Sequence, residues 1–277
     1  MNRLCLTAGV SAGYYRFLLQ PQRPEADREL RSQIQNIALR WPAYGYRRMQ
    51  AELERRGWRV NHKRVLGLMR VDNLLCVRRR KFIFTTDSKH GLPIYPNLAK
   101  DMRLTGINQL WVADITYIRL AAEFVYLAVL LDVFSRSCVG WALQRSLEAA
   151  LVLEALRMAL RRRHPTPGLV HHSDRGVQYA SRDYTQVLEQ QSIQISMSRR
   201  GNVYDNSLAE SFIKTLKYEE VYRTEYHNLE EAKASMQQFL EKIYNQKRLH
   251  SALGYRPPRE FEKSGSVSSS GASGALA

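Results

Sequence analysis

Apolar positions in the first third of the chain recur every three or four residues, the spacing of helices with one buried face. The first such run spans residues 26–39 and should end before Pro42, because proline disfavours helix in the residue that precedes it. A second run places Met49 and Leu53 on one face and stops at Gly57, a residue suited to the left-handed turn after a helix. This part of the chain is therefore predicted to be helical.

A third helical run follows in WRVNHKRVLGLMRVDNLL, where Asn61 can cap a helix that carries Val65, Leu68 and Met69 inward. The opposite face of that helix is basic. Two short helices around a tight turn, the second of them basic, predict a helix-turn-helix within residues 1–75. The basic residues predicted to contact DNA from this helix are His62, Lys63 and Arg64.

Residues 76–104 are rich in charge and carry two prolines, so we expect a linker with little core of its own. This linker opens with a basic block that we also expect at DNA, formed by Arg78, Arg79, Arg80 and Lys81.

Beyond residue 104 the pattern changes to β-branched and aromatic runs, namely WVADITYIRL, FVYLAVLLDVFS and SCVGWAL. The middle run is apolar on both faces and should form an interior strand. A helical run over 147–163, the strand GLVHHSD, a helix over 182–191, the strand IQISMS and a further helix follow. This order predicts an α/β catalytic domain over 105–222 with a mixed five-stranded sheet.

The last part of the chain is predicted to contain a helix over about 229–244 and a basic, proline-bearing stretch, NQKRLHSALGYRPPREF. Together they form a helical extension over residues 223–263. The tail, residues 264–277, has few large apolar side chains to bury and is expected to be disordered.

The net charge of the chain indicates the kind of partner that it binds. Its 42 Lys and Arg against 26 Asp and Glu give a formal net charge of +16, of which +13 lies in residues 1–104. A polyanion, and nucleic acid in particular, is the expected partner. Three scattered cysteines predict neither a disulfide framework nor a zinc site, and no apolar stretch is long enough to span a membrane, so we expect a cytoplasmic protein.

Three acidic residues are the candidate catalytic centre. Asp114 and Asp174 each follow an apolar run read as a strand, and Glu210 lies on a predicted helix after an interval of 35 residues. Neighbouring strand ends lie about 4.8 Å apart, so two such carboxylates can share a cation. A third from a covering helix can complete a site for two Mg²⁺ ions, which cleave or join phosphodiesters by flanking the scissile phosphate.

Each acid taken alone could equally be a surface or capping carboxylate. Asp132 also ends an apolar run, although a role in the following turn is at least as plausible, and Asp205 is the expected cap of the Glu210 helix. His171 and His172 should point to opposite faces of their strand, one buried and the other near DNA.

Basic residues surround the candidate centre. Lys214 and Lys217 follow Glu210 by four and seven residues, which keeps all three on one side of a helix, although an ion pair between Glu210 and Lys214 is the plainer reading. Arg199 and Arg200 form a basic loop before that helix and could close on DNA.

The segments WVADITYI, SDRGVQY, DNSLAESFIKTLK and NQKRLHSALGYRPP resemble the integrase core shared by bacterial insertion-sequence transposases and retroviral integrases. The likeness is greatest to the second-frame subunit of insertion elements whose transposase arises by frameshifting. It covers about residues 44–261, since YGYRRMQAELERRG is similar to the helix-turn-helix of that family.

This resemblance implies an RNase H-like core that uses two Mg²⁺ ions, for which Mn²⁺ can substitute, held by Asp114, Asp174 and Glu210, with Lys217 at the basic position of the family. It also implies strand cleavage at element ends and transfer of the freed 3′-hydroxyl into DNA by a multimer, with an upstream-frame partner protein. Two alternatives remain: an inactive DNA-binding regulator of transposition, and an RNase H-like nuclease that cuts without joining.

Overall fold

The computed structural model of the protein describes residues 24–75, 93–199 and 206–269. The chain divides near residue 78 into two compact units. Three sites predicted to contact DNA or cap a helix lie outside the described residues: the basic block 78–81, Arg200 and Asp205.

The N-terminal unit is a bundle of helices packed through their apolar faces. Its helices are α3 (Pro24–Arg40), α4 (Tyr46–Arg55) and α5 (His62–Val71). Their shared core holds Leu30, Ile34, Ile37, Met49, Leu53, Val65 and Met69, each no more than 1% exposed. Asn61 caps α5 by accepting a hydrogen bond of 2.8 Å from the Lys63 backbone, and Gly57 follows α4 with a φ of 84°, so both sequence signals are confirmed.

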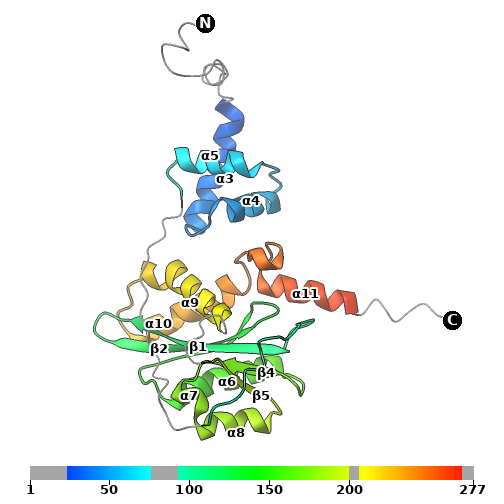
Figure 1. Ribbon diagram of the computed structural model, residues 1–277. Coiled ribbons are helices and arrows are strands. Elements are labelled where there is room, and N and C mark those ends of the chain that lie inside the picture. Colours follow the sequence, from blue (N-terminus) through cyan, green and yellow to red (C-terminus); the bar gives the residue numbers. More distant parts are fainter. Residues whose placement is uncertain (1–23, 76–92, 200–205, 270–277) are drawn as a thin grey trace, which may run out of the picture. The chain divides into compact units, whose positions relative to one another are not determined.

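The second unit is built on a mixed sheet of five strands (Figure 1). The strands are β1 (Leu110–Arg119), β2 (Phe124–Asp132), β3 (Cys138–Gln144), β4 (Val170–Ser173) and β5 (Gln194–Met197), in the order β3-β2-β1-β4-β5. Strand β2 is antiparallel to both neighbours, whereas β4 and β5 continue from β1 in parallel. The predicted RNase H-like α/β core and its interior second strand are confirmed.

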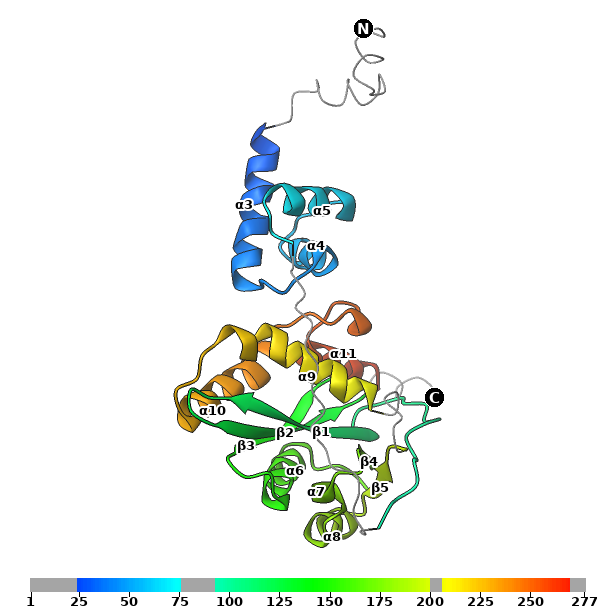
Figure 2. The same ribbon diagram turned by 60° about the vertical axis from the view of Figure 1, so that its left-hand side comes forward.

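Helices cover both faces of this sheet (Figure 2). One layer holds α6 (Ala149–Arg163), α7 (Val177–Ala180) and α8 (Arg182–Gln190), which pack on the face that presents Trp111, Ala113 and Ile115. The other layer holds α9 (Ser207–Glu219), α10 (Leu229–Gln237) and the π-helix η2 (Gln238–Tyr244), which pack on Val112 and Ile118. Because β1 is apolar on both faces, it is the centre of both cores.

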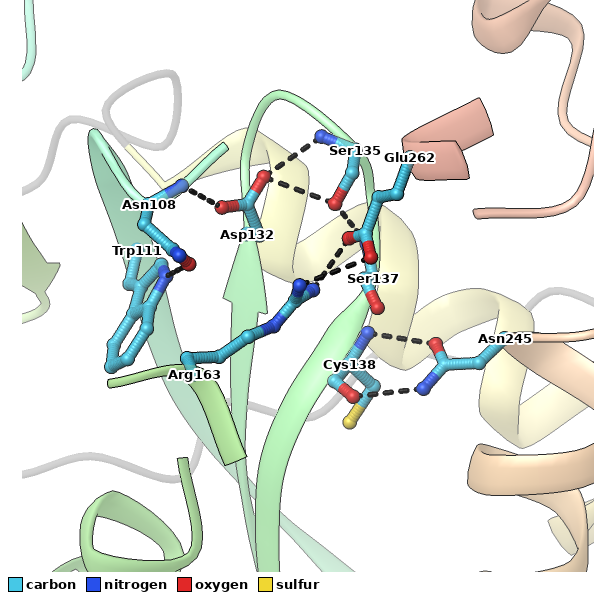
Figure 3. Close-up of polar contacts among 9 residues, drawn as sticks. All are labelled: Asn108, Trp111, Asp132, Ser135, Ser137, Cys138, Arg163, Asn245 and Glu262. Atoms are coloured by element: carbon cyan, nitrogen blue, oxygen red, sulfur yellow. Dashed lines mark hydrogen bonds and ion pairs between the residues drawn. The ribbon is translucent and has the colours of Figure 1, made fainter. Parts of the chain in front are cut away.

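The turn between β2 and β3 is fixed by buried polar contacts (Figure 3). Asp132 is fully buried and accepts hydrogen bonds from the Asn108 and Ser135 backbones, at 2.6 and 2.8 Å. The Asn245 side chain pairs with both backbone groups of Cys138, at 2.9 Å each. Asp132 therefore stabilises the turn, which is the alternative role that the sequence allowed for it. The C-terminal extension is hydrogen-bonded to the sheet through Asn245.

Two segments are more ordered than their sequences suggest. In the predicted linker, Pro96 and Leu98 hydrogen-bond to Met197 and Ser196 of β5. At the C-terminal end, α11 (Pro258–Ser269) continues six residues into the tail for which the sequence predicts no structure, and the Ser264 hydroxyl bonds to the preceding helical turn. In the parts of the chain that the structure describes, no helix combines the length and apolar character needed to cross a bilayer.

The approach of α6 to β3 depends on Gly140. A Cβ atom at this position would lie 2.3 Å from the Ala155 carbonyl oxygen and 2.9 Å from the Ala159 Cβ. These neighbours belong to the helix backbone and to a short side chain, so they can yield only if α6 moves away from the sheet.

We expect Gly140→Ala to lower the free energy of unfolding by about 1–3 kcal/mol, the usual cost of overpacking a core. Gly106→Ala, whose new Cβ would make only an ordinary contact of 3.8 Å with Gln109, is the matched control and should change stability by less than about 0.5 kcal/mol. Urea denaturation followed by circular dichroism measures both. Equal stability of the two variants would contradict the packing argument.

Candidate active site on the sheet and its covering helix

The register between β1 and β4 places two of the three predicted acids side by side. Val112 pairs with His172, so continuing the parallel register by two residues brings Asp114 level with Asp174, just beyond the end of β4. Adjacent strands lie about 4.8 Å apart. Consistent with this placement, the negative charge of Asp174 raises the pKa of Asp114.

The third acid is brought to the same region by α9. Asn206 occupies the N-cap position, but its side-chain amide donates a hydrogen bond of 3.2 Å to the Ala113 carbonyl of β1. Its own carbonyl accepts from the Glu210 backbone N–H at 3.1 Å, one helical turn further on. The first turn of α9 is thus attached to the strand residue that precedes Asp114, and the charge of Glu210 in this turn acts on Asp114.

Negative charge is in excess around Asp114 and the two other acids. The pKa of the half-buried Asp114 is raised to about 8, chiefly by burial, then by the negative charge of Asp174, with Glu210 adding to both. The hydrogen bond of 2.8 Å from the Ile115 N–H and the charge of Lys217 oppose this rise but do not cancel it. Burial also raises the pKa of Glu210. A bound cation would offset the negative charge of Asp114, Asp174 and Glu210.

The Asp174 carboxylate is oriented by the loop that follows it. Its Oδ1 accepts a hydrogen bond of 2.9 Å from the Gly176 N–H, and a Cβ on Gly176 would lie only 3.0 Å from that oxygen. Tyr179, on α7, is buried, and its hydroxyl has no partner among the described residues. Neither Gly176 nor Tyr179 was among the predicted site residues. The glycine two positions after the acid in SDRGVQY was nevertheless a usable signal that the backbone approaches the carboxylate closely.

Of the two lysines on α9, Lys217 is the one placed at the acids. It is half-buried, its Nζ lies 4.3 Å from the centroid of the Tyr117 ring, and burial lowers its pKa while Asp114 opposes that change. Lys214 is exposed, and within the described residues it makes no ion pair with Glu210. The ion-pair alternative is therefore not what the structure contains.

The remaining residues predicted to bind DNA differ in their surroundings. His62 and Lys63 are exposed on α5, and Arg199 is exposed after β5. Arg64 is also exposed, but its guanidinium pairs with Asp27 of α3. Among these four basic residues of the described parts of the chain, Arg64 is thus engaged in an ion pair within the N-terminal unit.

The prediction that one of the two histidines lies near DNA is wrong, because both are buried. His171 is hydrogen-bonded at 2.8 Å to the Tyr184 hydroxyl, and burial lowers its pKa to about 3, so it is neutral. His172 lies 2.8 Å from the Ser196 hydroxyl of β5. The His171 ring contacts Tyr179 and Tyr184 of the covering helices, and Ser198, just beyond β5, lies 3.4 Å from His172 Nε2, so alternation along the strand did not bring either ring to solvent.

The donor set suits a hard cation, although the side chains do not form a finished metal centre. Asp114, Asp174 and Glu210 offer only carboxylate oxygens, the ligands that Mg²⁺ prefers. Over residues 24–75, 93–199 and 206–269, however, no three His, Cys, Asp or Glu side chains lie close enough together to hold an ion. The fit rests on the oxygen chemistry and on the surroundings of Asp114, whose pKa is raised first by burial and then by the negative charge of Asp174.

Comparison with known families assigns both units. Residues 105–203 and 191–258 match models of the integrase core domain, and residues 25–82 match a model of an HTH-like domain. The second unit is thus an integrase core, and the helical unit before it is a helix-turn-helix-like domain, as predicted.

Whole-chain relatives come from bacterial insertion elements. The chain is 39% identical to the IS600 uncharacterized 31 kDa protein of Shigella sonnei, over 94% of this chain and 97% of that protein. It is 39% identical to the transposase of IS904 from Lactococcus lactis, over 79% and 87%, and 38% identical to transposase InsF of IS3A from Escherichia coli, over 79% and 76%. The chain belongs to this family of insertion-sequence transposases with an integrase core.

Solved structures that are similar to the chain include retroviral integrases. The catalytic core of HTLV-2 integrase in complex with magnesium is 16% identical, with a TM-score of 0.45, over 58% of this chain and 99% of that one. A simian T-cell lymphotropic virus intasome chain is 18% identical, with a TM-score of 0.47, over 77% and 70%.

The raised pKa of Asp114 has a consequence for stability without metal. Between the unfolded pKa near 4 and the folded pKa of about 8, the native state holds a proton that the unfolded state has lost. The contribution of this group to stability therefore falls as pH rises through that window, by at most about 1.4 kcal/mol per pH unit. Asp114→Asn should remove this slope. Between pH 5 and pH 8 the free energy of unfolding of the variant should therefore rise relative to that of the wild type.

Denaturant titrations in EDTA at several pH values measure this difference, and Asp101→Asn, at an exposed acid, is the control. A difference between wild type and Asp114→Asn that stays constant with pH would contradict the assignment.

Proposed function

We propose that this transposase cleaves DNA strands at the ends of its element and transfers the freed 3′-hydroxyl into target DNA at a metal centre formed by Asp114, Asp174 and Glu210. The observation that carries the proposal is the β1–β4 register, which sets Asp114 level with Asp174 beneath the helix that bears Glu210. Such a concentration of carboxylates costs stability unless a cation or a phosphate-bound metal compensates it.

Two Mg²⁺ ions, with Mn²⁺ able to substitute, suit these ligands, and when bound they supply charge stabilisation at the attacking and leaving oxygens of a phosphodiester. The carboxylates of Asp114, Asp174 and Glu210 would hold these ions. Because no three acidic side chains of the described residues lie close enough together to hold an ion, the proposal requires the three carboxylates to move closer to one another when metal binds.

The remaining groups of the site hold substrate and acids in place. The Gly176 N–H donates a hydrogen bond to Oδ1 of Asp174 and so helps to orient this carboxylate for an ion. Lys217, held over the Tyr117 ring, would take a phosphate oxygen next to the acids. In this proposal, water and then the freed 3′-hydroxyl attack the phosphodiester directly, so no covalent intermediate with the protein forms.

The N-terminal unit would supply most of the DNA affinity. His62 and Lys63 lie exposed on the second helix of the motif, where a basic face can enter the major groove. Arg199, Arg200, Lys214 and the block 78–81 are proposed as further phosphate contacts. Two element ends have to be joined, so we propose a multimer on DNA, acting with an upstream-frame partner protein or as a fusion with it.

Removing one acid should abolish chemistry without abolishing DNA binding. Asp174→Asn and Glu210→Gln should each lower cleavage and strand transfer by about a thousandfold or more, since several kcal/mol of transition-state stabilisation is lost. Glu189→Gln, at an exposed acid of α8, is the matched control and should retain both activities. The assay uses labelled element-end DNA with Mg²⁺, with cut and joined products separated on a denaturing gel.

The same gel separates the alternatives. Cutting without joined product would indicate a nuclease, and tight binding without cutting in the wild type would indicate a DNA-binding regulator. Full activity in Asp174→Asn would exclude the proposed centre.

Metal binding should depend on pH because Asp114 has to lose its proton to bind an ion. With a pKa of about 8, the apparent Mg²⁺ affinity of the free protein should weaken by up to about tenfold per pH unit below pH 8. The increase in Tm with MgCl₂ at pH 6, 7 and 8 measures this, and Asp114→Asn should lose the response while Glu189→Gln keeps it. A Mg²⁺ response independent of pH would contradict the role of Asp114.

A further inference from the structure

Four aromatic side chains gather beside Lys217, and the proposed chemistry uses only Tyr117, as the ring beneath that lysine. The rings of Tyr117 and Phe124 meet edge to face at 5.5 Å, and those of Tyr218 and Tyr222 do so at 5.8 Å. Tyr117 of the first pair also acts on Tyr222 of the second, since burial first, and then Tyr117 and Tyr218, raise the pKa of Tyr222. We call these four residues the aromatic surface.

The aromatic surface faces solvent. Phe124 is 52% exposed and Tyr222 is 56% exposed, while Tyr117 and Tyr218 are half-buried beneath them. Large exposed rings are costly in water and mark binding surfaces when they are contiguous.

The two halves of this surface are held together by the backbone. Tyr117 and Phe124 lie on the β1–β2 hairpin, and Tyr218 and Tyr222 lie at the end of α9 and on the short helix η1 (Val221–Arg223). The hairpin N–H of Ala121 donates a hydrogen bond of 2.9 Å to the Tyr226 carbonyl just beyond η1. Segments about a hundred residues apart thus form one surface.

The charge around these rings is positive. Arg119, Lys214, Lys217 and Arg223 flank them, and none of the four forms an ion pair within the portions of the chain that are described. Acids of the same segments have partners of their own: Glu219 binds Arg248 at 2.7 Å, Glu220 accepts from the Tyr226 hydroxyl at 3.2 Å, and Glu123 pairs with Arg145 at 3.0 Å. Rings interleaved with unpaired cations suit nucleotides better than they suit an apolar protein face.

The aromatic surface is also close to the acids. Lys217 contacts Tyr117 and acts on the pKa of Asp114, so it links the two places directly. Along β1, Tyr117 lies three residues from Asp114, which separates their backbones by about 10 Å.

We propose that the aromatic surface binds the bases of unpaired nucleotides of the DNA strand that passes over Lys217, by stacking on Phe124 and Tyr222. Lys217 and Arg223 hold the phosphates of the same strand. This inference rests on the proposed function for the identity of the DNA. The binding itself needs neither metal nor cleavage, so it can be tested separately.

The test compares full-length protein, in EDTA, on three element-end DNAs: fully paired, with a three-nucleotide unpaired tail, and with the same tail made abasic. Wild type should bind the tailed DNA more tightly than the paired or abasic DNA. The double variant Phe124→Ala, Tyr222→Ala should lose about 5- to 150-fold of that preference for each stacked base, and bind paired DNA unchanged.

Conservative variants Phe124→Tyr and Tyr222→Phe keep a ring and should keep the preference, and Ile107→Ala, at another exposed apolar residue, is the control for loss of surface. A 2-aminopurine in the tail should lose fluorescence on binding the wild type but not the double variant. Unchanged preference in the double variant, or equal binding of the abasic tail, would overturn the inference. Loss of self-association in sedimentation, with DNA preference intact, would instead identify a protein interface and also overturn it. If tailed DNA is preferred but never cut, the proposed function fails and this inference stands.

Discussion

The burial of Asp114 beside a second carboxylate, on neighbouring strands, is the constraint that the packing of the sheet has to accommodate. A parallel register between β1 and β4 leaves Asp114 and Asp174 level, and no described cation apart from Lys217 acts on Asp114 to offset them. The fold withstands this repulsion because β1 is apolar on both faces and is packed between two cores. The unfavourable charge is tolerated locally because the packing around it is extensive.

The position of Glu210 depends on contacts at both ends of α9. At the start of the helix, Asn206 hydrogen-bonds to β1 rather than capping its own helix. At the far end, Glu219 pairs with the buried Arg248, whose guanidinium also faces Tyr244 and His250. The C-terminal extension is therefore part of the catalytic domain: it fixes the helix that bears the third acid, and its Asn245 joins the edge of β3.

Features of this protein that depend on neighbouring residues could be predicted from the sequence, whereas those that depend on contacts between distant segments could not. Helix and strand positions followed from apolar spacing, the cap at Asn61 and the turn at Gly57 followed from residue type, and the order of strands and helices gave the mixed sheet. The motifs SDRGVQY and DNSLAESFIKTLK indicated the family, and the family matches agree. The prediction for the two histidines failed because alternation along a strand says nothing about which elements cover it.

The sequence by itself determined the elements, the family and the three acids as candidates, because these depend on local propensity and on residue chemistry. Only the tertiary structure decided that Asp114 and Asp174 share a register, that Asn206 rather than a capping contact ties α9 to the sheet, and that Lys217 lies over Tyr117. It also brought the hairpin of β1 and β2 next to η1. These are contacts between segments distant in the chain, and their geometry is set by the packing of whole layers, which no local pattern encodes.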